Sequence, residues 1–95
     1  MPNAWIMREL TEVEYDILNT VYFVETFDKI LEEVKFPANI VADSLKFLIR
    51  EKLVSPMKLD AKRKDYVRSF MYDSDNMRAY RYIITREGLE AHNTR

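Results

Sequence analysis

The feature that most constrains the fold is a change of hydrophobic period within one stretch, IVADSLKFLIREKLV, residues 40–54. Four apolar side chains in it recur at the spacing of one helical face: Val41, Leu45, Leu48 and Ile49. This helix is expected to open at residues 37–39, PAN. Leu53 and Val54 then leave it and begin an extended run to about Leu59. A helix that passes directly into a strand indicates a mixed fold.

Two further helices are expected before this stretch. Thr11 and Glu14 form a capping-box pattern ahead of apolar residues at helical spacing, which places the first helix near 11–24. Thr26 is a suitable N-cap for a second helix at about 27–35. That helix should end there because the residue before a proline avoids helical angles.

The first helix carries a second apolar face, formed by Tyr15, Leu18 and Tyr22. A helix that is apolar on two sides is either buried on both or contacts a partner. The N-terminal arm, residues 1–9 with Trp5, could cover this face within the chain. Alternatively, the arm and this face could form the contact of a homodimer, and the sequence leaves both interpretations open.

A second extended run, AYRYIIT, is expected at 79–85 because it is rich in aromatic and β-branched residues. It should pair with the first extended run as an antiparallel hairpin. A short closing helix, 86–92, is expected to follow.

The segment 60–78 between the two runs fits two interpretations. Its apolar residues have helical spacing, yet VRSFMYD and the turn-like DSDN also fit a long hairpin. The sequence therefore predicts one α+β domain over residues 1–95, with 60–78 as an extended wing.

Several classes of function are disfavoured by what the chain lacks. It has no cysteine and a single glycine, Gly88, which argues against thiolate chemistry and phosphate-cradling loops. Its one histidine, His92, is expected to be a surface residue near the chain end. We therefore expect no enzyme, no cofactor and no metal site. No leader pattern or long apolar run is visible, so a cytoplasmic protein is expected.

Charge is distributed unevenly along the chain. Residues 1–55 hold six basic and ten acidic side chains, whereas residues 56–95 hold nine basic and six acidic ones. The basic excess is concentrated in the predicted wing, at Lys58, Lys62, Arg63, Lys64 and Arg68. Such an asymmetry can orient a domain on an acidic partner, although a solvated loop would look the same.

Two stretches resemble the winged-helix family of transcriptional regulators. One is VADSLKFLIREKLV, where the family has a recognition helix running into the first wing strand. The other is YRYIITREGLEAH, which is similar to the second wing strand and its tyrosine-x-hydrophobic-threonine-x-x-glycine ending, here Tyr82, Ile84, Thr85 and Gly88. The resemblance covers roughly residues 10–92 and implies a winged helix-turn-helix fold: three helices, a β-hairpin wing and a short C-terminal helix.

The chain departs from the family pattern at three points. Lys52 stands where relatives usually have the glycine that ends the recognition helix, so it must adopt left-handed angles or use another turn. Asp43 replaces an arginine that commonly touches DNA. The chain also ends soon after Gly88, without the long helix through which many relatives dimerise.

The resemblance implies binding of double-stranded DNA and a role in transcription regulation. The third helix would face the major groove with Asn39, Asp43, Lys46 and Arg50, while the basic wing residues would lie along phosphates. The alternative is a winged helix that binds a protein without binding DNA. In that case Ile40 and Phe47, on the flank of the same helix, would make the contact together with the second face of the first helix.

Overall fold

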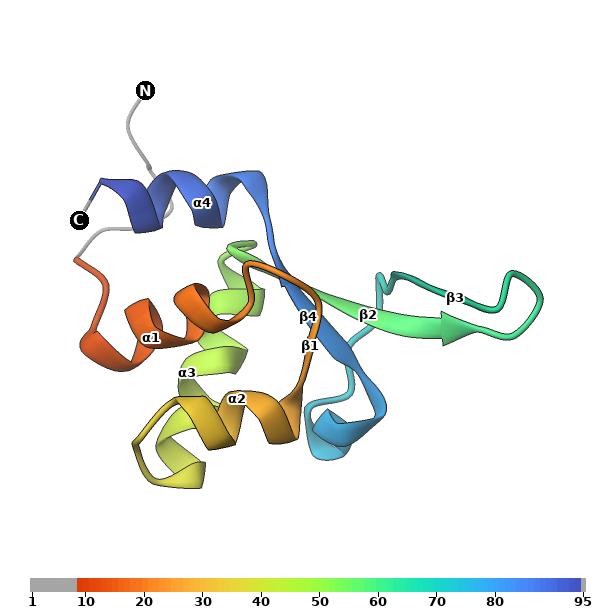
Figure 1. The fold of residues 1–95 in the computed structure, drawn as a ribbon, viewed down its shortest axis with the longest axis horizontal. Helices are drawn as coiled ribbons and strands as arrows, with labels where there is room; N and C mark the ends of the chain where they lie inside the picture. The colour runs from red at the N-terminus through yellow and green to blue at the C-terminus, as the bar shows by residue number, and fades with distance from the viewer. Residues whose placement is uncertain (1–8, 95) are drawn as a thin grey trace.

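The computed structural model describes residues 9–94 and shows a mixed α+β architecture (Figure 1). Helices and strands follow one another along the chain in this order: α1 (Glu12–Thr20), β1 (Glu25–Thr26), α2 (Phe27–Glu33), α3 (Ala38–Arg50), β2 (Val54–Asp60), β3 (Asp65–Arg68), the 3-10 helix η1 (Ser74–Ala79), β4 (Arg81–Ile84) and α4 (Arg86–Asn93). Within residues 9–94 the strands form one antiparallel sheet in the order β1-β4-β2-β3.

The caps predicted for the first two helices are confirmed. The Glu14 amide donates to the Thr11 hydroxyl at 3.1 Å, and the Glu14 carboxylate accepts from the Thr11 amide at 2.9 Å. Thr26 caps α2 by accepting from the Lys29 amide at 3.1 Å. Each bond satisfies an amide that the first helical turn leaves without a partner.

The predicted end of the first helix near residue 24 is wrong, because α1 stops at Thr20. The Val21 carbonyl accepts from the Ile84 amide at 2.9 Å, and the two residues of β1 pair with β4. Residues 21–24, which helical periodicity assigned to the first helix, therefore lead into β1 of the sheet instead. This short strand was not anticipated.

The junction between α3 and β2 follows the predicted change of period. Lys52 adopts the left-handed conformation, with φ 63°, which is the first of the two alternatives expected for this residue. The Leu53 amide bonds the Leu48 carbonyl at 2.8 Å, and the Lys52 amide bonds the Ile49 carbonyl at 3.0 Å. These two bonds are a Schellman ending, which satisfies the last carbonyls of the helix and offsets the strain at lysine.

The expected pairing of the two extended runs is confirmed, with Val54 opposite Ile84. The open question about 60–78 is resolved in favour of a hairpin, because Tyr66 and Val67 lie in β3, which pairs with β2. The helical interpretation of these residues is wrong. After β3 the chain turns back to η1 before it enters β4.

The second apolar face of α1 is covered within the chain by α4. Leu18 is fully buried, so its assignment to a partner or dimer surface is wrong. Tyr15 stacks on His92 with ring centroids 4.3 Å apart, and the Tyr22 hydroxyl lies 3.0 Å from His92 Nδ1. His92 is half-buried in this contact rather than a free surface residue. Trp5, the other expected cover, lies outside the described residues.

Gly88 permits a close approach rather than a left-handed backbone angle. A Cβ atom there would overlap the Leu53 carbonyl oxygen and lie 2.8 Å from Cγ1 of Ile84. Thr85 caps α4 beside it, accepting from the Gly88 amide at 2.9 Å. Its own amide bonds the Leu53 carbonyl at 3.0 Å, so α4 begins against the end of α3.

We expect Gly88→Ala to lower the free energy of unfolding by about 2–3 kcal/mol, because its methyl group meets backbone that cannot move aside. Urea denaturation followed by circular dichroism measures this. Glu90→Ala, an exposed substitution in the same helix, is the control and should leave stability nearly unchanged. Equal stability of the two variants would contradict the close contact.

Candidate functional site

The exposed face of α3 carries the four residues that the sequence assigned to DNA: Asn39, Asp43, Lys46 and Arg50. Two of them are an internal ion pair, since Lys46 Nζ lies 3.4 Å from Asp43 Oδ1. Arg50 lies 3.6 Å from the Glu51 carboxylate and 5.4 Å from the Phe47 ring centroid. Both cations of this face therefore already have an acidic neighbour, which reduces their attraction for phosphate.

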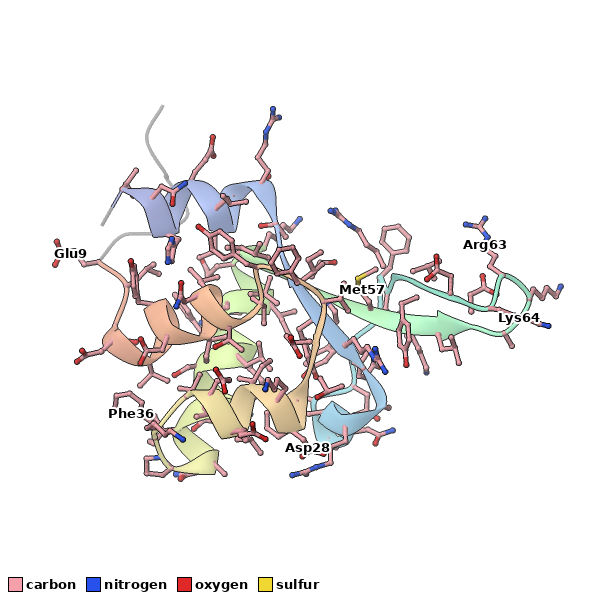
Figure 2. All side chains as sticks on the ribbon, viewed as in Figure 1. Glu9, Asp28, Phe36, Met57, Arg63 and Lys64 are labelled. Carbon is pink, nitrogen blue, oxygen red and sulfur yellow. The ribbon has the colours of Figure 1, made fainter. Side chains whose placement is uncertain are left out.

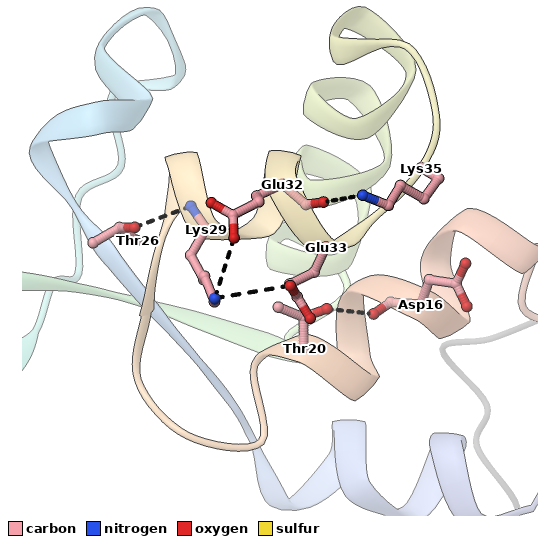
Figure 3. A network of polar contacts seen from close by, with 7 residues as sticks. All are labelled: Asp16, Thr20, Thr26, Lys29, Glu32, Glu33 and Lys35. Carbon is pink, nitrogen blue, oxygen red and sulfur yellow. Dashed lines mark hydrogen bonds and ion pairs between the residues drawn. The ribbon is translucent and has the colours of Figure 1, made fainter.

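The outer face of α2 is also neutralised internally (Figure 3). Lys29 Nζ lies 3.4 Å from the Glu32 carboxylate and 3.8 Å from that of Glu33. The hydrogen bond from Lys29 to Glu32 raises the pKa of this lysine, so it stays charged. Lys35 donates to the Glu32 carbonyl at 3.0 Å. The pairs leave no excess of positive charge on this helix.

The β2–β3 hairpin projects from the body and places Arg63 and Lys64 at its far end (Figure 2). Asp60 holds the turn, accepting from the Lys62 amide at 2.9 Å and the Arg63 amide at 3.3 Å. The same carboxylate lies 3.8 Å from the Arg63 side chain. Lys62 and Lys64 make no ion pair with any residue in 9–94. The tip therefore carries two lysines that have no ion pair in this range, beside the paired Arg63.

The register of the sheet divides the predicted basic group between two faces. Met57 lies opposite Arg68 on one side and Arg81 on the other, so these three share a face. Lys58 projects to the opposite face because successive strand residues alternate, and it lies 5.6 Å from the Tyr80 ring centroid.

Arg81 was missed at the level of sequence. Its guanidinium lies 4.5 Å from the Tyr66 ring centroid, beside Arg68 on the outer face of the sheet. The alternation in AYRYIIT could have identified it, because Tyr80 and Tyr82 face the core and the residue between them must face outward.

The apolar residues predicted to contact a partner are only partly available. Phe47 is half-buried against the core, while Ile40 and Tyr22 remain about two-fifths exposed. More exposed than any of these are Phe70, at 103%, and Met71, at 82%, on the segment that follows β3. The sequence placed both residues in the segment that fits either a helix or a hairpin, and this open interpretation did not identify them as surface residues.

The segment from β3 to β4 is held by a cluster of three tyrosines: Tyr72, Tyr80 and Tyr82. The Tyr82 hydroxyl, fully buried, donates to the Met77 carbonyl at 2.8 Å and accepts from Tyr72 at 2.9 Å. Tyr80 accepts from the Asp73 amide at 3.0 Å. Burial raises the pKa of Tyr72 to about 12 and raises that of Tyr82 further.

Asp75, in η1, and Asn39, at the start of α3, line the same pocket, which brings a second carboxylate to the face that carries Asp43. Nearby, Arg78 is bound to the Asp28 carboxylate at 2.7 Å. The first turn of α3 therefore lies beside the Asp75 carboxylate and the ion pair of Arg78 with Asp28.

Among residues 9–94, no three histidine or carboxylate side chains lie close enough together to hold a metal ion. In the same range, no helix has the length and apolar character needed to cross a lipid bilayer.

Comparison of the chain with protein-family models, curated proteins and solved structures gave no significant match. The geometry of the molecule is therefore the basis for assigning a function.

We expect stability to fall at alkaline pH through the tyrosine cluster. Because the folded protein holds these protons more tightly than the unfolded chain, their contribution is complete below pH 10 and is lost as pH rises through about 12. Urea titrations between pH 9 and 12 measure the decline. Tyr72→Phe should make it shallower, and a wild-type profile that stays flat would contradict the buried cluster.

Proposed function

We propose that this chain is a winged helix-turn-helix domain that binds double-stranded DNA, as transcriptional regulators do. The observation that carries the proposal is the basic hairpin, whose tip cations Lys62 and Lys64 project beyond the body without acidic partners among residues 9–94. A phosphate backbone is a polyanion that such a surface attracts, because neutralising phosphates with lysine and arginine releases condensed counterions.

The arrangement of elements supports the same proposal. α2 and α3 are joined by a short turn through Pro37, and α3 presents a polar face along its exposed side. β2 begins directly after α3 and starts the hairpin, in the order that the resemblance implies. In this proposal α3 enters the major groove while the hairpin lies along the backbone.

In this proposal α3 and the hairpin have different roles, because their charges differ. α3 offers hydrogen-bonding groups to bases, since Asn39 can pair with adenine and Asp43 can accept from cytosine. It adds little net attraction, because Lys46 and Arg50 have acidic neighbours. The hairpin and the adjoining strand supply affinity through four cations without an ion pair in residues 9–94, with a salt slope of about −4: Lys62, Lys64, Arg68 and Arg81.

We expect Lys62→Gln combined with Lys64→Asn to weaken binding to a random-sequence duplex and to reduce the salt slope by about 2. Asparagine is chosen at 64 because the backbone there is left-handed, with φ 55°. Fluorescence anisotropy between about 50 and 200 mM salt measures both effects. The matched control, Lys35→Gln with Arg86→Gln, removes two exposed charges elsewhere and should keep the wild-type slope. Equal slopes in both variants would remove the wing from the proposal.

A second candidate function, binding a protein partner, is favoured by the exposed pair Phe70 and Met71. Large apolar side chains that stand next to each other in water are typical of an interaction surface. The segment that bears them is fixed by the tyrosine cluster, so the pair is presented on an ordered support.

For this second function we expect Phe70→Ser with Met71→Ser to abolish partner capture while the thermal midpoint stays unchanged, because neither side chain is buried. Affinity capture compared with calorimetry tests this. Leu89→Ser, at a partly exposed position of α4, is the control. A loss of duplex binding in the double variant would instead assign the pair to the DNA surface.

A further inference from the structure

A pocket of about 340 Å³ opens between α2, the start of α3 and η1. Its apolar lining comes from both helices and from the segment before β4: Phe27, Leu31, Ala42 and Met77. Phe27 and Met77 are themselves buried, so they form a fixed floor. The volume lies at the lower end of the range for sites that bind small molecules.

Three polar side chains line the same pocket, and none has a partner within residues 9–94: Asn39, Ser74 and Asp75. The fourth polar residue, Arg78, is bound to Asp28 at 2.7 Å and lies 5.3 Å from the Phe27 ring centroid. Because that pair is neutral, the carboxylate of Asp75 is the uncompensated charge of the pocket.

The walls are held in place before any ligand arrives. The Tyr82 hydroxyl donates to the Met77 carbonyl, and the Tyr80 hydroxyl accepts from the Asp73 amide at 3.0 Å. The Asp73 carboxylate in turn accepts from the Asp75 amide at 3.0 Å, which orients the first turn of η1. A pocket with a fixed wall costs less ordering on binding.

We propose that this pocket binds a small primary amine with an apolar body. An ammonium group has three donors, and the lining offers three acceptors: the Asp75 carboxylate, the Asn39 side-chain carbonyl and the Ser74 hydroxyl. The apolar body packs on Phe27 and Met77. An anionic ligand is expected to bind more weakly, because it would meet the Asp75 carboxylate while Arg78 is already paired with Asp28.

A ligand in the pocket would also affect the exposed face of α3, because Asn39 lines the pocket and belongs to that face. A bound amine therefore takes the acceptor that Asn39 would offer to a base. This consequence rests on the proposed DNA binding, whereas the binding of the amine does not.

The test uses 2-phenylethylamine, with 2-phenylethanol and 3-phenylpropionate as neutral and anionic compounds of the same apolar body. Amide chemical shifts of the isotope-labelled chain are followed by NMR without DNA. We expect saturable shifts at Asn39, Ser74 and Asp75, with a Kd on the order of 1 mM for the amine. The alcohol should bind about fivefold more weakly. Absent shifts, shifts elsewhere, or equal binding of the anion would overturn the proposal.

Two variants test whether the amine binds in the pocket or elsewhere on the surface. Asp75→Asn should reduce amine affinity to that of the alcohol, while Asp65→Asn, on exposed β3, should leave it unchanged. Equal amine affinity in these two variants would also overturn the proposal. Duplex anisotropy with and without the amine tests the coupling separately. Amine binding without an effect on DNA would keep the pocket and remove only its link to α3.

Discussion

The fold depends on the carbonyl oxygen of Leu53, where four elements meet. It accepts the Thr85 amide at 3.0 Å, and the Thr85 hydroxyl donates to the neighbouring Lys52 carbonyl at 2.8 Å. These bonds join the end of α3 to the end of β4 as α4 begins. A side chain at Gly88 would separate them, which explains why the chain places its single glycine there. The direction of the wing and the docking of α4 on α1 both follow from this junction.

The sequence predicted those parts of the fold that depend on local interactions. The threonine caps at 11 and 26 involve residues three apart, and the change of period at Leu53 is visible within one stretch. β1 could not be predicted, because two residues show no period and this strand exists only by pairing with β4. The stacking of His92 on Tyr15, seventy-seven positions earlier in the chain, likewise could not be predicted, because no local pattern reports such a contact.

In the candidate site, too, the sequence predicted the features that depend on local spacing and not those that depend on tertiary contacts. Helical period alone identified the exposed face of α3, and the i,i+3 spacing of Asp43 and Lys46 is that of an ion pair. The sheet face on which Lys58 and Arg81 lie could not be predicted without the register of the strands. A shift of the register by one residue would move every side chain of a strand to the other face. The meeting of Asn39 and Asp75 required the tertiary fold, because η1 reaches α3 only after the hairpin has turned back.

The segment 60–80 places cationic side chains and the Asp75 carboxylate at opposite ends of its path, with the cations at the hairpin tip and Asp75 at the base. At its tip, Asp60 accepts from the turn amides, while Arg63 and Lys64 lie at the far end of the hairpin. At its base, the tyrosine cluster fixes η1 beside α3, with Asp75 facing the pocket. Under the two proposals, a polyanion would bind at the tip, and a small ammonium ligand would bind at the base beside Asp75. The two ends of this segment are held by different interactions, turn capping at the tip and buried hydroxyl bonds at the base, so a change at one end need not alter the other.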